Sequence, residues 1–216
     1  MKQESVLFLI AHNDDQLLGA GGTIAKYAKE GKKVITIIFS FGESSQPFIQ
    51  DHHTRKVRVK ESKRAQKILG EEELYYLGLT ETKFPEEIKQ RDIHTKIKNI
   101  IKKNKPSKIF THSMDDPHPD HRAVYNFVMN LVEKINFKGN IYSFNIWNYF
   151  INFRQRNQPK LVVDISDTFK IKVEAFKKHK SQFNTIIMHM WYVYFQAFLQ
   201  GLMHGVKCAE VFYKLK

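Results

Sequence analysis

Short runs of consecutive apolar residues recur along the chain, and a longer segment of helical character follows most of them. Continuous apolar runs are typical of strands buried on both faces. We predict strands over residues 5–11, 32–42, 73–79, 108–112, 140–147 and 160–166, and helices over residues 15–30, 53–70, 85–104, 121–135, 167–183 and 190–214. This alternation predicts one α/β domain over residues 1–216, with a Rossmann-like, doubly wound, mostly parallel sheet and helices on both faces.

Residues 185–205, TIIMHMWYVYFQAFLQGLMHG, form the most apolar and aromatic stretch of the chain. His189, Gln196 and Gln200 interrupt it, which argues against a membrane-spanning segment. We interpret it as a core helix or as a helix at the interface of a homo-oligomer. Contact with a membrane surface is the alternative.

The chain of 216 residues is 42% hydrophobic, which is enough for one well-formed core. Its single cysteine, Cys208, excludes a disulfide within one chain. The first apolar run is too short for a signal peptide, so we expect a cytoplasmic protein. The formal charge is +13, but the lysines are scattered along the chain, which favours a solvated basic surface over a nucleic-acid groove.

Two polar clusters follow predicted strands. His12, Asp14 and Asp15 come directly after the first strand, and His118 and His121 lie in the loop and helix after the strand at 108–112. Ligands of open parallel sheets gather at the carboxyl ends of the strands, so we expect the two clusters to meet. Imidazoles and carboxylates without cysteine suit a catalytic zinc ion or a similar divalent metal, which would also offset the repulsion between adjacent aspartates.

Each cluster alone has a simpler explanation. Asp120 could cap the helix that begins at His121, and Asp14 and Asp15 could be solvated groups at a helix start. The presence of both clusters, each at the end of a predicted strand, favours the metal site.

Several motifs together resemble the LmbE-like, or PIG-L-like, family of metal-dependent N-deacetylases. The first is AHNDDQLLGAGGTIA at residues 11–25 and the second is HPDHRAV at residues 118–124. RVKESKRAQKILG, HKSQF and GVKCAEVF resemble further family segments, in the same order, so the resemblance covers nearly the whole chain.

The resemblance implies a role for each residue that matches a family motif. His12, Asp15 and His121 would bind zinc, Asp14 would act as general base, and His118 would stabilise or protonate the tetrahedral intermediate. Asp120 would steer an imidazole, and Arg58 would lie near the substrate. The expected reaction is removal of the N-acetyl group from an N-acetylglucosamine-containing substrate, which could be a small amino sugar or a glycoconjugate.

The sequence departs from the family pattern at three places. Asn13 stands where proline is usual, Gln16 where glutamate is usual, and GLTETKF at residues 78–84 lacks a common aspartate. These departures leave a second hypothesis open, a catalytically impaired deacetylase-like domain that binds a glycan, a lipid headgroup or nucleic acid. An iron enzyme with the same two histidines and one carboxylate is a further alternative.

Overall fold

A computed structural model describes residues 3–43, 51–147 and 158–216. Within these residues, seven strands form one sheet in the order β3-β2-β1-β4-β5-β7-β6. The strands are β1 (Ser5–Ile10), β2 (Lys33–Ile38), β3 (Glu73–Tyr76), β4 (Lys108–His112), β5 (Asn140–Phe144), β6 (Lys160–Asp164) and β7 (Ala209–Lys214). The first five pair in parallel, and β7 runs antiparallel to both of its neighbours. The sheet is therefore mostly parallel, as the sequence predicts.

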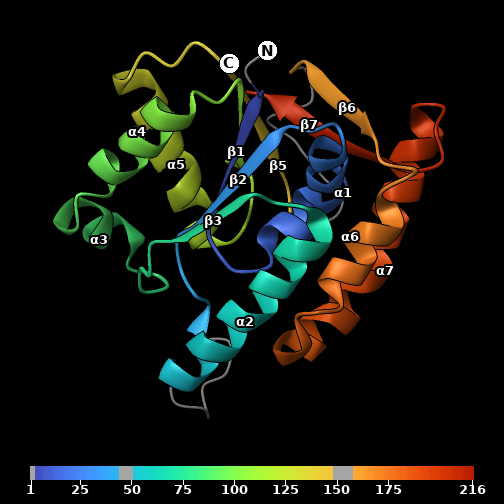
Figure 1. The fold of residues 1–216 in the computed structure, drawn as a ribbon, viewed down its shortest axis with the longest axis horizontal. Coiled ribbons are helices and arrows are strands. Elements are labelled where there is room, and N and C mark those ends of the chain that lie inside the picture. Colours follow the sequence, from blue (N-terminus) through green and yellow to red (C-terminus); the bar gives the residue numbers. More distant parts are fainter. Residues whose placement is uncertain (1–2, 44–50, 148–157) are drawn as a thin grey trace.

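Helices cover both faces of this sheet (Figure 1). They are α1 (Asp15–Lys29), α2 (Asp51–Leu69), α3 (Phe84–Gln90), α4 (Ile93–Asn104), α5 (Pro119–Lys134), α6 (Phe169–Phe176), the short 3-10 helix η2 (Lys180–Gln182) and α7 (Phe183–Met203). In Figure 1, α3, α4 and α5 lie on one side, and α1, α2, α6 and α7 lie on the other. This arrangement confirms the predicted single-domain, doubly wound α/β fold.

The alternation of side chains along β1 divides the core into two layers. Val6, Phe8 and Ile10 pack with residues of α1, α2, α6 and α7. Leu7 and Leu9 point the other way and pack with residues of α3, α4 and α5. A strand that is buried on both faces needs apolar residues at every position, and this explains the uninterrupted run in the sequence.

Two predicted helices are shorter than expected. The helix predicted over residues 85–104 is divided into α3 and α4, because Asp92 adopts a left-handed backbone conformation with φ of 49°. The helix predicted over residues 167–183 ends at Phe176, and η2 follows it.

The helix predicted over residues 190–214 is wrong at both ends. α7 begins at Phe183 and ends at Met203, and the chain then turns through Gly205, whose φ is 71°. Ala209–Lys214 form β7, which pairs between β5 and β6. Among the described residues, none of the helices combines the length and the apolar character that a membrane span requires.

The connections leave β1 in opposite directions at the centre of the sheet. The chain continues from β1 to β2 and β3 on one side, and β4 and β5 lie on the other. The carboxyl ends of β1 and β4 therefore border the switch point, which is where doubly wound sheets bind their ligands.

Candidate active site

The turn from β1 into α1 supplies the first part of the site. The backbone N–H of His12 donates to Asp15 Oδ2 over 2.7 Å, so the Asp15 carboxylate is fixed at the start of α1. A helix N-terminus favours such a negative charge. Asp14 precedes the helix, and its Oδ1 lies 3.7 Å from Nη2 of the buried Arg58. The two adjacent aspartates thus have different partners.

The segment from β4 into α5 supplies the second part. His112 ends β4, and Pro119 opens α5, where the missing N–H of proline costs nothing. His118 caps the helix, because its Nδ1 accepts a hydrogen bond from the backbone N–H of Asp120 over 3.2 Å. His121 follows in the first helical turn and is fully buried.

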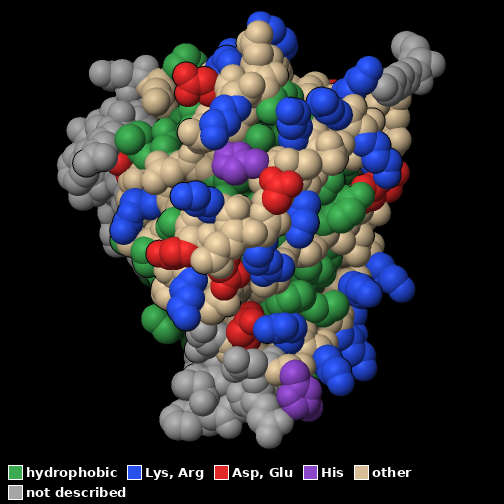
Figure 2. Space-filling view, turned by 90° about the vertical axis from the view of Figure 1, so that its left-hand side faces the viewer, with side chains coloured by type: hydrophobic (Ala, Val, Ile, Leu, Met, Phe, Trp, Pro, Cys, Tyr) green, Lys and Arg blue, Asp and Glu red, His purple; other side chains and the backbone are tan. Residues whose placement is uncertain are grey.

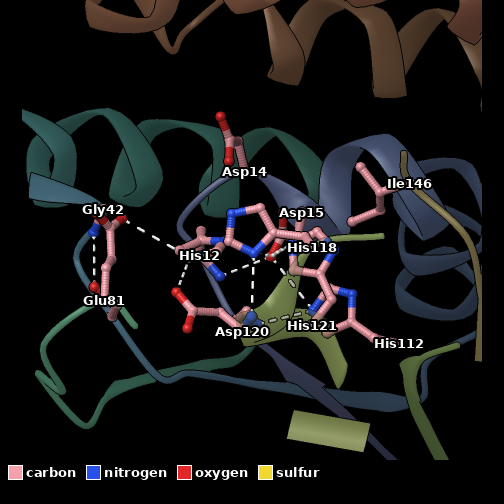
Figure 3. Close-up of polar contacts among 12 residues, drawn as sticks. His12, Asp14, Asp15, Gly42, Glu81, His112, His118, Asp120, His121 and Ile146 are labelled. Atoms are coloured by element: carbon pink, nitrogen blue, oxygen red, sulfur yellow. Dashed lines mark hydrogen bonds and ion pairs between the residues drawn. The ribbon is translucent and has the colours of Figure 1, made fainter. Parts of the chain in front are cut away.

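Three imidazole nitrogens surround one carboxylate oxygen, Asp15 Oδ2 (Figure 3). The distances from this oxygen are 3.5 Å to His12 Nδ1 and 3.4 Å to His121 Nε2. The third nitrogen, His112 Nε2, lies at 3.3 Å. His118 completes the group, with its ring centroid 4.9 Å from that of His12 and 4.7 Å from that of His121.

Two further carboxylates lie behind the histidines. Asp120 Oδ2 lies 3.1 Å from His12 Nε2, and Asp116 Oδ1 lies 3.0 Å from His121 Nδ1. Each carboxylate thus occupies one ring nitrogen and leaves the other directed at Asp15. Carboxylates in this position orient metal-binding histidines and make their ligating nitrogens more basic.

These distances fit a tetrahedral metal site. Metal–ligand bonds of about 2.0–2.1 Å at a tetrahedral zinc ion place neighbouring ligand atoms roughly 3.3–3.4 Å apart. The separations of His12 Nδ1 and His121 Nε2 from Asp15 Oδ2 match this value to about 0.1–0.2 Å. The same separations are long for strong hydrogen bonds. The three side chains therefore have the chemistry of a two-histidine, one-carboxylate metal site, and each histidine lies at the spacing of a neighbouring ligand from Asp15.

Among the described residues, two groups of three side chains have ligand atoms that all lie within 4.8 Å of one another, His12 with His118 and His121, and Asp15 with His112 and His121. The predicted ligands His12, Asp15 and His121 are divided between these two groups, which share His121. In each group, one ring nitrogen of one histidine already accepts a hydrogen bond from a backbone N–H. His112 Nε2 accepts the backbone N–H of Ala11 over 2.9 Å, and His118 Nδ1 accepts that of Asp120. The proton of neutral His118 is thereby directed to Nε2, which makes this nitrogen a donor rather than a metal ligand.

The acidic surroundings hold protons on two histidines when no metal is bound. Burial opposes the charged form of His12, but hydrogen bonds with Asp120 and Asp15 raise its pKa to about 10. Burial likewise opposes protonation of His121, yet the charge of Asp15 and the contact with Asp116 raise its pKa to about 9. A metal ion must displace these protons, so metal affinity falls as the pH falls.

The remaining histidines of the cluster behave in the opposite way. Burial, followed by the nearby charge of His121, lowers the pKa of His112 to about 4. Burial, followed by the charge of His12, also lowers the pKa of His118. Both are neutral at pH 7, which agrees with their roles as hydrogen-bond acceptors from the backbone.

Arg58 and Asp14 lie apart from the histidines. In Figure 3, Asp14 is turned toward α2, whereas Asp15 lies among the histidines. Arg58, on α2, is 2% exposed and donates from Nη1 to the carbonyl oxygen of Gly42 over 3.0 Å. The arginine predicted to bind substrate is thus a buried side chain beside Asp14.

Sequence reasoning missed three residues of this site. His112 and Asp116 contact the cluster directly, and Glu81, in the loop after β3, places Oε1 3.8 Å from His12 Nε2. The position of a histidine at the last residue of β4 was the available signal for His112. The loop lacks the aspartate usual in the family, and its Thr82 donates a backbone N–H to Asp120 over 2.9 Å.

The fold and the position of the cluster define a doubly wound α/β protein with a ligand site at the switch point. A family model described as "PIG-L: GlcNAc-PI de-N-acetylase" matches residues 7–132, and the chain belongs to this family. The resemblance seen in the sequence motifs is thereby confirmed.

Relatives of known description agree with this assignment. A diacetylchitobiose deacetylase of Thermococcus kodakarensis is 29% identical over 96% of this chain and 81% of its own. The solved N,N'-diacetylchitobiose deacetylase of Pyrococcus horikoshii shares 24% identity and a TM-score of 0.81 over 98% of this chain and 84% of its own. The 4-carboxy-2-hydroxymuconate hydratase GalB of Pseudomonas putida has a TM-score of 0.77 at 19% identity, over 99% of this chain and 97% of its own. The fold thus hosts more than one reaction, while the sequence relationship supports a deacetylase.

Proposed function

We propose that this protein is a metal-dependent N-deacetylase that removes the acetyl group from an N-acetylglucosamine-containing substrate. The approach of His12 Nδ1 and His121 Nε2 to Asp15 Oδ2, at the spacing of ligands around one zinc ion, carries the metal part of this proposal. The family description and the diacetylchitobiose deacetylases support the substrate class.

His12, Asp15 and His121 would hold the zinc ion, although another divalent metal such as iron suits the same ligands. When bound, zinc lowers the pKa of a water molecule from about 15.7 to about 7 and polarises a carbonyl oxygen. Asp120 and Asp116 orient the two imidazoles, since each contacts the ring nitrogen directed away from Asp15.

The other residues handle protons and developing charge. In the proposed reaction, Asp14 accepts the proton of the water that adds to the acetamide carbonyl. His118 donates from Nε2 to the carbonyl oxygen as that oxygen becomes negative. The C–N bond then breaks, the amine leaves with the proton that Asp14 accepted, and acetate is released. His12 and His118 are partly exposed while Asp15 and His121 are buried, so the substrate would approach from the side of His12 and His118.

The departures at Asn13 and Gln16 are compatible with catalysis. Both side chains are buried, and the Asn13 amide oxygen accepts a hydrogen bond from Ser62 on α2. Asn13 therefore anchors the β1–α1 turn to α2 and takes no part in the histidine cluster. The alternative, a binding domain without turnover, gives no reason for the complete set of oriented histidines.

Amine release from a panel of N-acetylglucosamine compounds tests the proposal. The panel contains the monosaccharide, diacetylchitobiose and conjugates with an acidic or lipid group, and the protein is used at measured metal content. We expect release that chelation abolishes and that added zinc restores. Release that survives complete removal of metal would contradict the metal-dependent mechanism, and no release from fully loaded protein would favour the binding domain.

Two variants separate the roles of the residues. Asp14→Asn is expected to reduce turnover by about 10²–10⁴-fold while the metal content stays near that of the wild type. His121→Ala is expected to lose both metal and turnover. Full activity of Asp14→Asn would show that another group is the base.

A further inference from the structure

One face of α7 exposes an unusually large apolar surface. Its exposed large hydrophobic residues are Ile187, Met188, Trp191, Tyr194, Phe195, Phe198, Leu202 and Met203. The opposite face of the helix is buried, where Val193 and Ala197 pack into the core with residues of α1 and α6. Within the part of the chain that the structure describes, burial therefore accounts for only one of the two apolar faces of this helix.

The exposed residues follow the spacing of a helix-pairing seam. Met188, Trp191, Phe195, Phe198 and Leu202 are separated by three, four, three and four residues, and each is between 44% and 80% exposed. This is the a/d pattern of coiled coils, in which each side chain fits between residues of a facing helix. We call these five residues the α7 seam. Their spacing fits a second helix better than a flat surface.

The amount of exposed surface suits a protein interface. Each aromatic side chain can bury about 150–250 Å², so the exposed parts of the eight residues amount to on the order of 600 Å². The largest apolar patch on a typical monomer measures about 300–600 Å², and a standard interface buries about 800 Å² per partner. The α7 face with its rim therefore approaches the size of a stable dimer interface.

The distribution of charge indicates what covers this face. The chain carries a net charge of +13, yet α7 contains no Asp, Glu, Lys or Arg from Phe183 to Met203. Two copies of such a cationic protein repel each other least where they meet through an uncharged surface. A helix that binds anionic lipid would instead carry Lys and Arg along its polar side. The charge pattern thus favours a second copy over a membrane.

We propose that the α7 seam pairs with the α7 seam of a second copy of this chain, forming a homodimer with the two helices side by side. The same surface serves both copies, as twofold symmetry requires. The residues of the histidine cluster come from one chain and none of them lies on α7, so the dimer and the proposed deacetylase activity can be tested separately.

The molar mass in solution tests the dimer. We expect sedimentation and light scattering of the wild-type protein to give twice the mass of the chain at micromolar concentrations. Phe195→Glu and Leu202→Glu place a charge in the seam, and each should raise the dissociation constant by about 30-fold or more. Asn130→Glu is the matched control, because Asn130 is exposed on α5, on the other side of the sheet from α7, and it should leave the mass unchanged.

A cross-link supplies a second measurement. Phe195→Cys, near the middle of the seam, should form a covalent dimer on oxidation, whereas the native Cys208 is buried and should not. A monomeric wild-type protein would overturn the proposal, as would a dimer that withstands both glutamate substitutions. Sedimentation of a monomer with phosphatidylglycerol vesicles would show that the seam faces lipid instead.

Discussion

Two carboxylates decide how the histidines of the candidate site are used. Asp120 contacts His12 and Asp116 contacts His121, each at about 3 Å, and each leaves one ring nitrogen for Asp15. Both carboxylate oxygens of Asp116 have partners, because Oδ2 accepts a hydrogen bond from the backbone N–H of Ile146 over 3.2 Å. The orientation of His121 thus depends on a residue that is itself buried.

We therefore expect Asp116→Asn to weaken zinc binding by about 10–100-fold, since the amide no longer provides the negative charge behind His121. Competition with a fluorescent chelator measures this affinity. Asp115→Asn is the control, because Asp115 lies in the same loop but outside the group of carboxylates that contact the histidines. Equal zinc affinity of the wild type and Asp116→Asn would remove Asp116 from the site.

The buried Glu71, which follows α2, makes the stability of the protein depend on pH. Burial raises the pKa of Glu71 to about 7 from a reference of 4.5, and the Thr36 hydroxyl opposes this only in part. Because the folded state holds the proton more tightly, the stability contributed by this group falls as the pH rises from 4.5 to 7. Above pH 7 the buried charge destabilises the fold.

Glu71→Gln is accordingly expected to stabilise the protein above pH 7 by up to about 2–3 kcal/mol, and to have little effect below pH 4.5. Urea denaturation at pH 4.5 and pH 8 measures the difference. The exposed neighbour Glu72→Gln should change the stability by less than about 1 kcal/mol at either pH. An equal effect of Glu71→Gln at both values would contradict the assigned pKa.

At the scale of elements, α1 is held at its middle by a buried ion pair. Lys172 of α6 lies 2.7 Å from Glu210 of β7 and also donates to the carbonyl oxygen of Leu18. Glu210 accepts the backbone N–H groups of Gly22 and Thr23 over 3.0 and 2.7 Å. The helix that begins with Asp15 is thus bound to two elements from the end of the chain.

Glu210→Ala should lower the free energy of unfolding by about 3–5 kcal/mol, because it leaves the Lys172 ammonium buried without its carboxylate. Urea denaturation measures this loss. The exposed pair of Lys178 and Glu174 offers a control, and Glu174→Ala should cost less than about 1 kcal/mol. If both variants lost a similar amount of unfolding free energy, the buried Glu210–Lys172 pair would contribute no more to stability than an exposed pair.

The pattern of apolar and polar residues predicted those helices and strands whose conformation depends mainly on their own sequence. The strands β1 and β4 and the helix α1 agree closely with the ranges predicted for them. β7 was missed because its residues follow a long apolar helix after a short turn. Its strand conformation depends on pairing with β5 and β6, which only the complete sheet brings together. The same holds for Asp116, whose role depends on the distant His121 side chain and Ile146 backbone.

At the scale of the whole molecule, the sheet brings together residues that lie about a hundred positions apart in sequence. β1 pairs with β4, so the end of one strand places Asp15 beside His112 and His121. The rule that ligands bind at the switch point predicted that these two clusters lie together. Which ring nitrogen of each histidine contacts which carboxylate could be seen only in the structure. The basic charge has no comparable focus on the face in Figure 2, where Lys and Arg are interspersed with acids.

Because the proposed metal ligands come from the β1–α1 turn, α1 and α5, metal binding should stabilise the whole fold. Zinc at a hundred times its dissociation constant adds about 2.7 kcal/mol, which for a domain of this size corresponds to a rise of about 5–10 °C in Tm. Thermal unfolding with chelator and with zinc measures the shift. His121→Ala should lose most of it, whereas the exposed His204→Ala should retain it. Equal shifts in the wild type and His121→Ala would mean that zinc binds elsewhere on the molecule.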